Sequence, residues 1–238
     1  MQNRAEYLQA LGIDVWLPRP AREAPAPATP AARVASVTPA SPPARELSAG
    51  EAALWAGLEA EVRVCTRCDL AASRTQTVFG VGNRHAALMV IGEAPGADED
   101  RQGEPFVGRA GQLLNAMLRA LRMPREQVFI ANVLKCRPPN NRDPLPGEVA
   151  CCLDYLHRQV ALVKPALLLA VGRIAAQNLL ATDTPIGKLR GQKHVFGNPG
   201  TPLLVTYHPA YLLRSPGEKR RAWQDLLFVR HELARLRG

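Results

Sequence analysis

Short apolar runs alternate with amphipathic stretches along most of the chain. The apolar runs are mainly aliphatic and predict four buried strands, at residues 87–91, 128–133, 166–171 and 203–206. The amphipathic stretches predict helices near residues 111–121, 146–162, 173–180 and 218–236. Strands that alternate with helices pair in parallel, with helices on both faces of the sheet. The pattern therefore predicts an α/β fold, three-layer α/β/α with a central four-stranded parallel sheet.

The first 47 residues follow a different pattern. Residues 1–17 form a short amphipathic segment, and residues 18–47 form a linker in which 16 of the 26 residues from 18 to 43 are proline or alanine. Proline fixes φ and removes a donor, so the linker is semi-extended. Ser48 followed by Glu51 has the spacing of a capping box, which predicts a helix start. We therefore expect a folded domain at residues 48–238.

Composition and charge narrow the class of protein. Apolar residues make up 47% of the 238 residues, enough for a sizeable core, and no apolar run is long enough to cross a bilayer. No secretory signal is evident at the N-terminus, so we expect a cytoplasmic, nucleoid-associated protein without a membrane partner. The net charge of +9 attracts polyanions and makes nucleic acid a candidate partner.

Four cysteines have the spacing of one metal site. Cys65 and Cys68 form a C-x-x-C pair, and Cys136 is followed sixteen residues later by Cys152. In a reducing compartment, clustered cysteines are more often metal ligands or catalytic groups than disulfides. Thiolates suit either zinc or an iron–sulfur cluster, and the spacing leaves both open.

Polar loops follow three of the predicted strands. The first strand leads into residues 92–100, the second ends at Asn132 and leads into 135–142, and the fourth leads into 207–210. In parallel sheets, ligands gather at the carboxyl ends of the strands. Each loop alone is a weak signal, because a Gly-Pro-Gly loop is usually a turn and a His-Pro pair is more often structural. Together they predict one binding site.

With these motifs the chain resembles the family 4 uracil-DNA glycosylases, which bind an iron–sulfur cluster. The resemblance covers about residues 50–235. It rests on the cysteine spacing and on four motifs: residues 92–96 (GEAPG), 108–111 (GRAG), 132–142, and 208–216 (HPAYLLRSP). It implies hydrolytic excision of uracil from DNA, which leaves an abasic site in base excision repair. It also implies a 4Fe-4S cluster with Cys65, Cys68, Cys136 and Cys152 as ligands. Cys151 is a departure, because a small residue is usual there, and a shift of one residue would exchange it with Cys152.

The resemblance also implies roles in uracil binding. Phe106 is expected to stack on the base, and the Asn132 amide to read the carbonyl and N–H edge of uracil. Glu99 is expected to crowd C5 and so to exclude thymine. Each has a plainer interpretation, namely a core phenylalanine, a strand-end cap and a solvated acidic turn. The first loop completes the predicted uracil site with Gly92, Glu93, Ala94, Pro95 and Gly96.

The expected catalytic residues are His208 and Asn141. His208 should donate to the uracil carbonyl oxygen, where negative charge grows as the glycosidic bond breaks. Asn141 is the candidate that positions the water, although a turn role is equally consistent with its loop. Leu212 is expected to wedge into the base stack, with burial in the core as the equal alternative. Arg214 is expected to contact a phosphate of the DNA.

Other functions remain open from the sequence. The chain could be a metal-stabilised nucleic-acid-binding module with weak catalysis, or a related glycosylase for another deaminated base. The partner we expect is DNA containing uracil, bound by a monomer. Residues 1–17 are a candidate docking peptide for a partner protein, with simple disorder as the alternative.

Overall fold

The computed structural model describes residues 47–197 and 200–237. The predicted segment at 1–17 and almost all of the linker at 18–47 lie outside the described residues. Within the described residues, the strands are β1 (Val81–Gly82), β2 (Leu88–Gly92), β3 (Phe129–Asn132), β4 (Leu167–Val171), β5 (His194–Phe196) and β6 (Thr201–Thr206). The longer helices are α2 (Ala49–Arg63), α5 (Arg109–Ala120), α6 (Pro146–Val163), α7 (Arg173–Leu180) and α10 (Lys219–Arg237). The short helices are α3 (Leu70–Ser73), α4 (Ala97–Gln102), α8 (Ile186–Leu189) and α9 (Pro209–Arg214), with 3₁₀ turns at Arg125–Gln127, Pro139–Asn141 and Pro216–Glu218.

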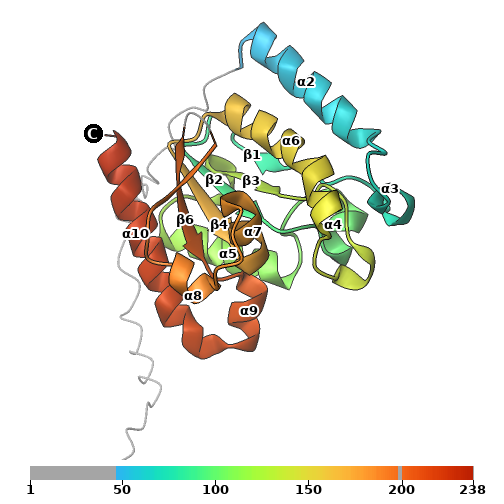
Figure 1. Cartoon of the computed structure of the whole chain (residues 1–238). Coiled ribbons are helices and arrows are strands. Elements are labelled where there is room, and N and C mark those ends of the chain that lie inside the picture. The colour runs from blue at the N-terminus through green and yellow to red at the C-terminus, as the bar shows by residue number, and fades with distance from the viewer. Residues whose placement is uncertain (1–46, 198–199, 238) are drawn as a thin grey trace, which may run out of the picture. The chain divides into compact units, whose positions relative to one another are not determined.

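The six strands form one sheet in the order β1-β3-β2-β4-β6-β5 (Figure 1). The four central strands are parallel, which confirms the predicted four-stranded parallel core. The edge strands β1 and β5 are antiparallel additions that the sequence did not predict. They have two and three residues, too short for an apolar pattern to stand out.

Alternate residues of the central strands enter two separate cores. On one face, Met89, Ile91 and their neighbours pack against α2, α6 and α7. On the other face, Leu88, Val90 and their neighbours pack against α5, α9 and α10. Both faces of each strand are buried, which is why the strands are continuously apolar. The predicted α/β/α layering is thus confirmed.

Ser48 caps α2 as its sequence predicts. The Glu51 N–H donates to Ser48 Oγ at 3.2 Å, and the Ser48 N–H donates to the Glu51 carboxylate at 3.0 Å. α2 ends at Arg63 and delivers the chain directly to Cys65. None of the helices among residues 47–197 and 200–237 combines the length and the apolar character needed to cross a membrane.

Candidate uracil pocket and cysteine site

The loops after β2, β3 and β6 surround one pocket of about 420 Å³ at the carboxyl ends of the strands. This is the edge at which the sequence predicted a site. The parallel register places Gly92 opposite Asn132, so the ends of β2 and β3 meet at the base of the pocket. The pocket brings together most of the predicted residues, namely Glu93, Ala94, Pro95, Gly96, Glu99, Phe106, Asn132, Asn141, His208 and Arg214.

The side-chain oxygen of Asn132 has unsatisfied hydrogen-bonding capacity. The Asn132 side chain is 2% exposed, and its Oδ1 is buried without a hydrogen-bond donor among the described residues. Gly92 leaves the room that this amide occupies, since a Cβ at Gly92 would lie 2.4 Å from that oxygen. A buried acceptor without a partner costs about 1–3 kcal/mol. A ligand with an N–H group at this position would remove that cost.

Phe106 is held in an unusual backbone conformation beside Asn132. Its φ is 55°, a region that bulky residues rarely adopt. Gly111 makes the conformation possible, because a Cβ there would lie 1.7 Å from the Phe106 carbonyl oxygen. Arg125 holds the loop from the other side by donating to the carbonyls of Phe106 and Pro105. The buried ring therefore presents a fixed aromatic face to the pocket.

Glu99 joins the two loops that flank Phe106. Its carboxylate accepts from the N–H of Gly96 at 3.1 Å, of Val107 at 3.0 Å and of Gly108 at 3.2 Å. A carboxylate that accepts several N–H bonds makes a strong charge-assisted connection. Glu99 thus lines the pocket, as its predicted role against thymine requires, and it also has a structural role that the sequence did not indicate.

His208 is a neutral imidazole with a defined tautomer. Its Nδ1 accepts from the Ala210 N–H at 3.1 Å, which leaves the proton on Nε2. Burial and, to a smaller extent, the nearby Arg214 lower the pKa of His208 to about 4, with Glu99 opposing the shift. The ring lies 5.6 Å from that of Phe106, centroid to centroid. His208 can therefore donate from Nε2 into the pocket at neutral pH.

Asn141 lies at the rim of the same pocket in a tight turn. Both Asn140 and Asn141 have φ of 53°, which asparagine tolerates better than most residues. The Asn141 Oδ1 accepts from Arg137 Nε at 2.8 Å. Arg142 pairs with the buried Glu148 at the start of α6, which fixes the far end of the turn. Asn141 therefore lies in a turn, as its alternative interpretation has it, and it also lines the pocket, as the water-positioning role requires.

Glu93 is the carboxyl group with the most altered titration near the pocket. Burial and, to a smaller extent, the Asp143 carboxylate raise the pKa of Glu93 to about 7, with Arg173 opposing the rise. The Asp143 carboxylate pairs with Arg173 at 2.7 Å. Glu93, Asp143 and Arg173 also line a second pocket of about 490 Å³ on the far side of His208.

The residues predicted to meet DNA divide between the surface and the core. Arg214 is exposed at the mouth of the pocket. Leu212 is 1% exposed and packs in the core beneath α9, whereas Leu213 is 37% exposed. In this conformation the surface position that a wedge requires belongs to Leu213. The buried alternative for Leu212 is the one that the structure favours.

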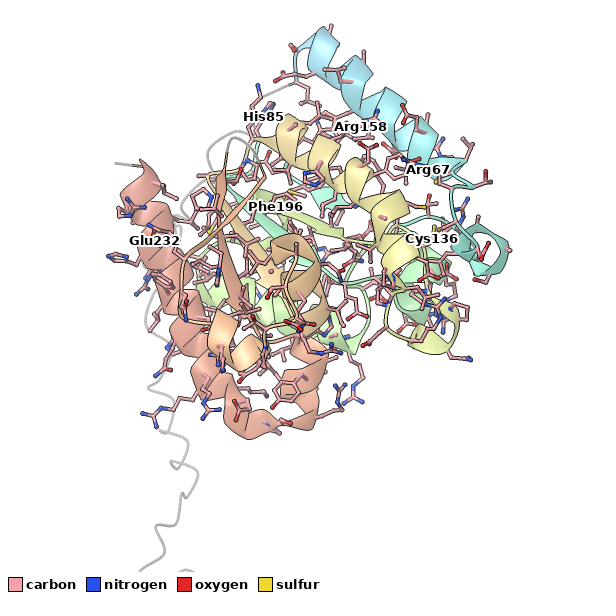
Figure 2. The ribbon with its side chains drawn as sticks, viewed as in Figure 1. Arg67, His85, Cys136, Arg158, Phe196 and Glu232 are labelled. Atoms are coloured by element: carbon pink, nitrogen blue, oxygen red, sulfur yellow. The ribbon has the colours of Figure 1, made fainter. Side chains whose placement is uncertain are left out.

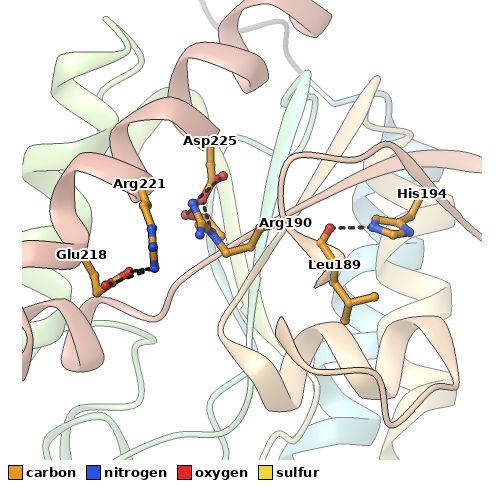
Figure 3. A network of polar contacts seen from close by, with 7 residues as sticks. Leu189, Arg190, His194, Glu218, Arg221 and Asp225 are labelled. Carbon is orange, nitrogen blue, oxygen red and sulfur yellow. Dashed lines mark hydrogen bonds and ion pairs between the residues drawn. The ribbon is translucent and has the colours of Figure 1, made fainter. Parts of the chain in front are cut away.

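A polar network centred on Arg190 and Asp225 supports the end of β6 (Figure 3). Arg190 donates to the Asp225 carboxylate at 2.7 and 3.0 Å, and Thr206 Oγ1 donates to the same carboxylate at 2.8 Å. The Arg190 guanidinium also lies over the Tyr207 ring, 4.1 Å from its centroid. Residues 206 and 207 directly precede His208, so this network anchors the end of β6 to α10.

The predicted metal ligands come together on another side of the domain. Cys65, Cys68, Cys136 and Cys152 line one small pocket between α3 and α6 with a volume of about 10 Å³. Figure 2 places Cys136 and Arg67 on this flank, well away from Glu232 on α10. Cys151 lines the same pocket.

The two buried predicted ligands each have a hydrogen-bond partner within the chain. Arg74 Nη1 donates to Cys136 Sγ at 3.1 Å, and the Lys135 N–H donates to Cys152 Sγ at 3.2 Å. Donors to ligating sulfur atoms tune and hold a metal centre. The set favours Cys152 over Cys151 as the fourth ligand.

The four sulfurs fit a group that carries positive charge. Burial raises the pKa of Cys68 and of Cys136, and it raises the pKa of Cys152 to about 11. Bound metal supplies the positive charge that makes such thiols into thiolates. Among the described residues, no three His, Cys, Asp or Glu side chains could hold a single metal ion. A cluster of several irons does not need such a set, since its irons take separate thiolates.

Several residues that shape these sites escaped the sequence analysis. They are Lys135, Arg74, Tyr155, Asp100, Arg125 and Gly172. A Cβ at Gly172 would lie 2.9 Å from the His208 Cβ, and the buried Asp100 carboxylate accepts from the Thr75 N–H at 3.0 Å. Only Lys135 carried a sequence signal, as a lone charge between apolar residues at the end of a strand.

Comparisons with known proteins agree with this geometry. The model of the Uracil DNA glycosylase superfamily matches residues 79–227. The chain is 47% identical over 162 residues to a type-4 uracil-DNA glycosylase of Archaeoglobus fulgidus, which covers 66% of this chain and 81% of the relative. It is 40% identical to a type-4 uracil-DNA glycosylase of Sulfurisphaera tokodaii over 74% of this chain and 83% of the relative. A type-5 uracil-DNA glycosylase of Thermus thermophilus is 29% identical over 68% of this chain and 80% of the relative.

The fold, the pocket and the superfamily match define a glycosylase of the uracil-DNA class. Within that class the type-4 relatives are more similar to this chain than the type-5 relative is. The chain belongs to the type-4 uracil-DNA glycosylases.

Proposed function

We propose that this protein hydrolyses the N-glycosidic bond between uracil and deoxyribose in DNA and leaves an abasic site. The observation that carries the proposal is the buried Asn132 Oδ1, which lacks a donor among the described residues, on a side chain that lines the pocket together with Phe106 and His208. Uracil has an N–H at the matching edge, and its neighbouring carbonyl can accept from the Asn132 amide nitrogen. Cytosine lacks that N–H, so it would leave the Asn132 oxygen unpaired.

The uracil must leave the duplex to reach this pocket. Phe106 offers a fixed aromatic face on which the extruded base stacks. Glu99 holds the two loops on either side of that face in place, so the width of the slot is fixed before the base arrives. A slot of fixed width disfavours the extra methyl group of thymine, in agreement with the role expected for Glu99.

His208 acts on the departing base. As the glycosidic bond breaks, negative charge grows on a uracil carbonyl oxygen, and the His208 Nε2–H donates to it. A donor that meets growing charge in a buried site stabilises the transition state more than the ground state. Asn141, at the rim, positions the water that attacks the sugar. The water adds to the anomeric carbon, its proton leaves to solvent, and uracil departs with the bonding electron pair.

The cysteine site is proposed to hold a 4Fe-4S cluster through Cys65, Cys68, Cys136 and Cys152. When bound, such a cluster would connect the segment after α2, the end of β3 and α6 through its four thiolates. We propose that the enzyme acts as a monomer on DNA in the cytoplasm, where Arg214 meets a phosphate and Leu213 meets the base stack.

A uracil-containing oligonucleotide tests the function directly. After incubation with the protein, treatment with alkali should cut the strand at the uracil position, and free uracil should appear in equal amount. An otherwise identical strand with cytosine or thymine should stay intact. Faster release of hypoxanthine than of uracil would favour a different deaminated base. Intact uracil strands would favour the nucleic-acid-binding module.

A further inference from the structure

Lys135 is a fully buried cation between the two sites. Its side chain is 1% exposed, and its Nζ donates to the Asn132 carbonyl at 2.7 Å and to Gln159 Oε1 at 2.6 Å. Both acceptors are neutral. A buried polar group is costly unless it is hydrogen-bonded, so these two acceptors hold the Lys135 side chain in place.

The main chain of Lys135 connects the end of β3 to the cysteine site. Its N–H donates to Cys152 Sγ at 3.2 Å, and its carbonyl accepts from the Val78 N–H at 2.8 Å. Gln159 lies on α6 with Cys152, and its Nε2 donates to the Phe79 carbonyl at 2.8 Å. One residue therefore ties the cysteine helix and the segment before β1 to the end of β3.

The contact with Asn132 is the one with a consequence for the pocket. Asn132 is the last residue of β3, and the N–H groups of Val133 and Leu134 just beyond it still donate to the carbonyls of Gly92 and Glu93. The Lys135 ammonium adds a side-chain bond to the Asn132 carbonyl across three residues. An amide that reads a base must be held to within a fraction of an ångström, and this is the work of groups behind it.

We propose that Lys135 is a positioning residue that holds the base-reading amide of Asn132 in place through its hydrogen bond to the Asn132 carbonyl. The inference rests on the proposed function of the pocket. It connects uracil recognition to the cysteine site, because the Lys135 N–H donates to Cys152 Sγ.

The test is a double-mutant cycle in the iron-loaded protein. Lys135→Met, Asn132→Ala and their combination are compared for single-turnover excision of uracil and for affinity towards free uracil by calorimetry. We expect Lys135→Met to weaken both by about tenfold, since coupled neighbours interact by 0.5–3 kcal/mol. In the Asn132→Ala background the same change should cost less than about twofold, because the group that Lys135 positions is gone.

A parallel cycle with His208→Ala separates positioning from general damage. Lys135→Met should keep its full factor in that background, since His208 is held by other contacts. Equal factors in the Asn132→Ala and His208→Ala backgrounds would overturn the inference, as would a wild-type affinity for uracil in Lys135→Met. A wild-type protein that neither excises nor binds uracil would instead overturn the proposed function itself.

Iron content and thermal midpoint are measured for every variant. The surface variant Lys188→Met serves as the matched control and should behave as wild type. Should Lys135→Met fail to fold, Gln159→Met decides the question. It removes one acceptor of the ammonium and should show the same dependence on Asn132 with a smaller factor, about threefold. A factor for Gln159→Met that is independent of Asn132 would count against the inference.

Discussion

The uracil pocket and the cysteine site treat their polar atoms in opposite ways. At the cysteine site the buried sulfurs of Cys136 and Cys152 each have a hydrogen-bond donor from the chain. In the pocket the Asn132 Oδ1 is buried with no donor among the described residues. The first site is completed from within, while the second is left one partner short. This difference indicates that the substrate must supply the hydrogen-bond donor that Asn132 Oδ1 lacks.

The two regions also differ in where their rigidity comes from. The pocket depends on backbone shapes that side chains rarely permit, such as the φ of 55° at Phe106, and on the glycines around it. The cysteine site depends on bringing together three distant segments by their sulfur atoms. Substitution of a predicted ligand should therefore lower the stability of the whole domain, while substitution of a pocket residue should affect one step of the reaction.

The largest effect is expected at the cysteine site. Cys152→Ser should lose the bound iron, because it removes a buried ligand whose N–H donor is already in place. The neighbouring Cys151→Ser is the matched control and should keep its iron. Iron-to-protein ratio and visible absorption measure both. Iron retained by Cys152→Ser and lost by Cys151→Ser would exchange the two assignments.

His208→Ala should come next, with a loss of about 10²–10³ in the single-turnover rate. The loss should fall on the chemical step, with uracil–DNA binding little changed. His157→Ala is the control, because His157 stacks on Phe196 and lines none of the uracil pocket. Since the pKa of His208 is lowered to about 4, the wild-type rate should show no His208 inflection near pH 6.5. A loss below tenfold would contradict the donor role.

Glu99→Gln separates the structural role of this residue from the steric one. The side chain keeps its size, but its amide NH₂ would face backbone N–H groups that donate to the carboxylate in the wild-type protein. We expect about a tenfold loss in kcat/KM and a loss in stability of about 2 kcal/mol. Asp98→Asn, in an exposed pair with Arg101, should change stability by less than about 1 kcal/mol. Unchanged kinetics for Glu99→Gln would leave only the steric role.

Glu93→Gln should act on stability rather than on the reaction, and its effect should depend on pH. A carboxyl group whose pKa is raised to about 7 in the folded state binds its proton more tightly there than in the unfolded chain. Its contribution to stability is therefore present below the ordinary pKa and is lost as pH rises through 7. The variant should gain about 2 kcal/mol over wild type at pH 8 and much less near pH 5. Urea unfolding at both pH values measures this, with the exposed Asp183→Asn as the matched control.

The sequence predicted the central fold because the four parallel strands are buried on both faces and so are continuously apolar. The edge strands β1 and β5 were missed, since two or three residues carry no period. The pocket could be predicted because the motifs at the carboxyl ends of strands are local in sequence. The contacts of Glu99 could not be predicted, because the N–H groups that donate to its carboxylate lie three, eight and nine residues away along the chain. Leu212 and Leu213 differ only in the side of α9 that they occupy, which a short helix does not reveal.

The hydrogen bond between Thr75 and Asp100 connects the pocket with the segment that carries Cys65 and Cys68. Asp100 belongs to the helix that carries Glu99, and Thr75 follows the arginine that donates to Cys136. With the proposed cluster bound, residues 65–76 would be held in place, and this contact would then hold the helix of Glu99. Enzyme prepared without the cluster should therefore discriminate uracil from thymine less sharply than the loaded enzyme.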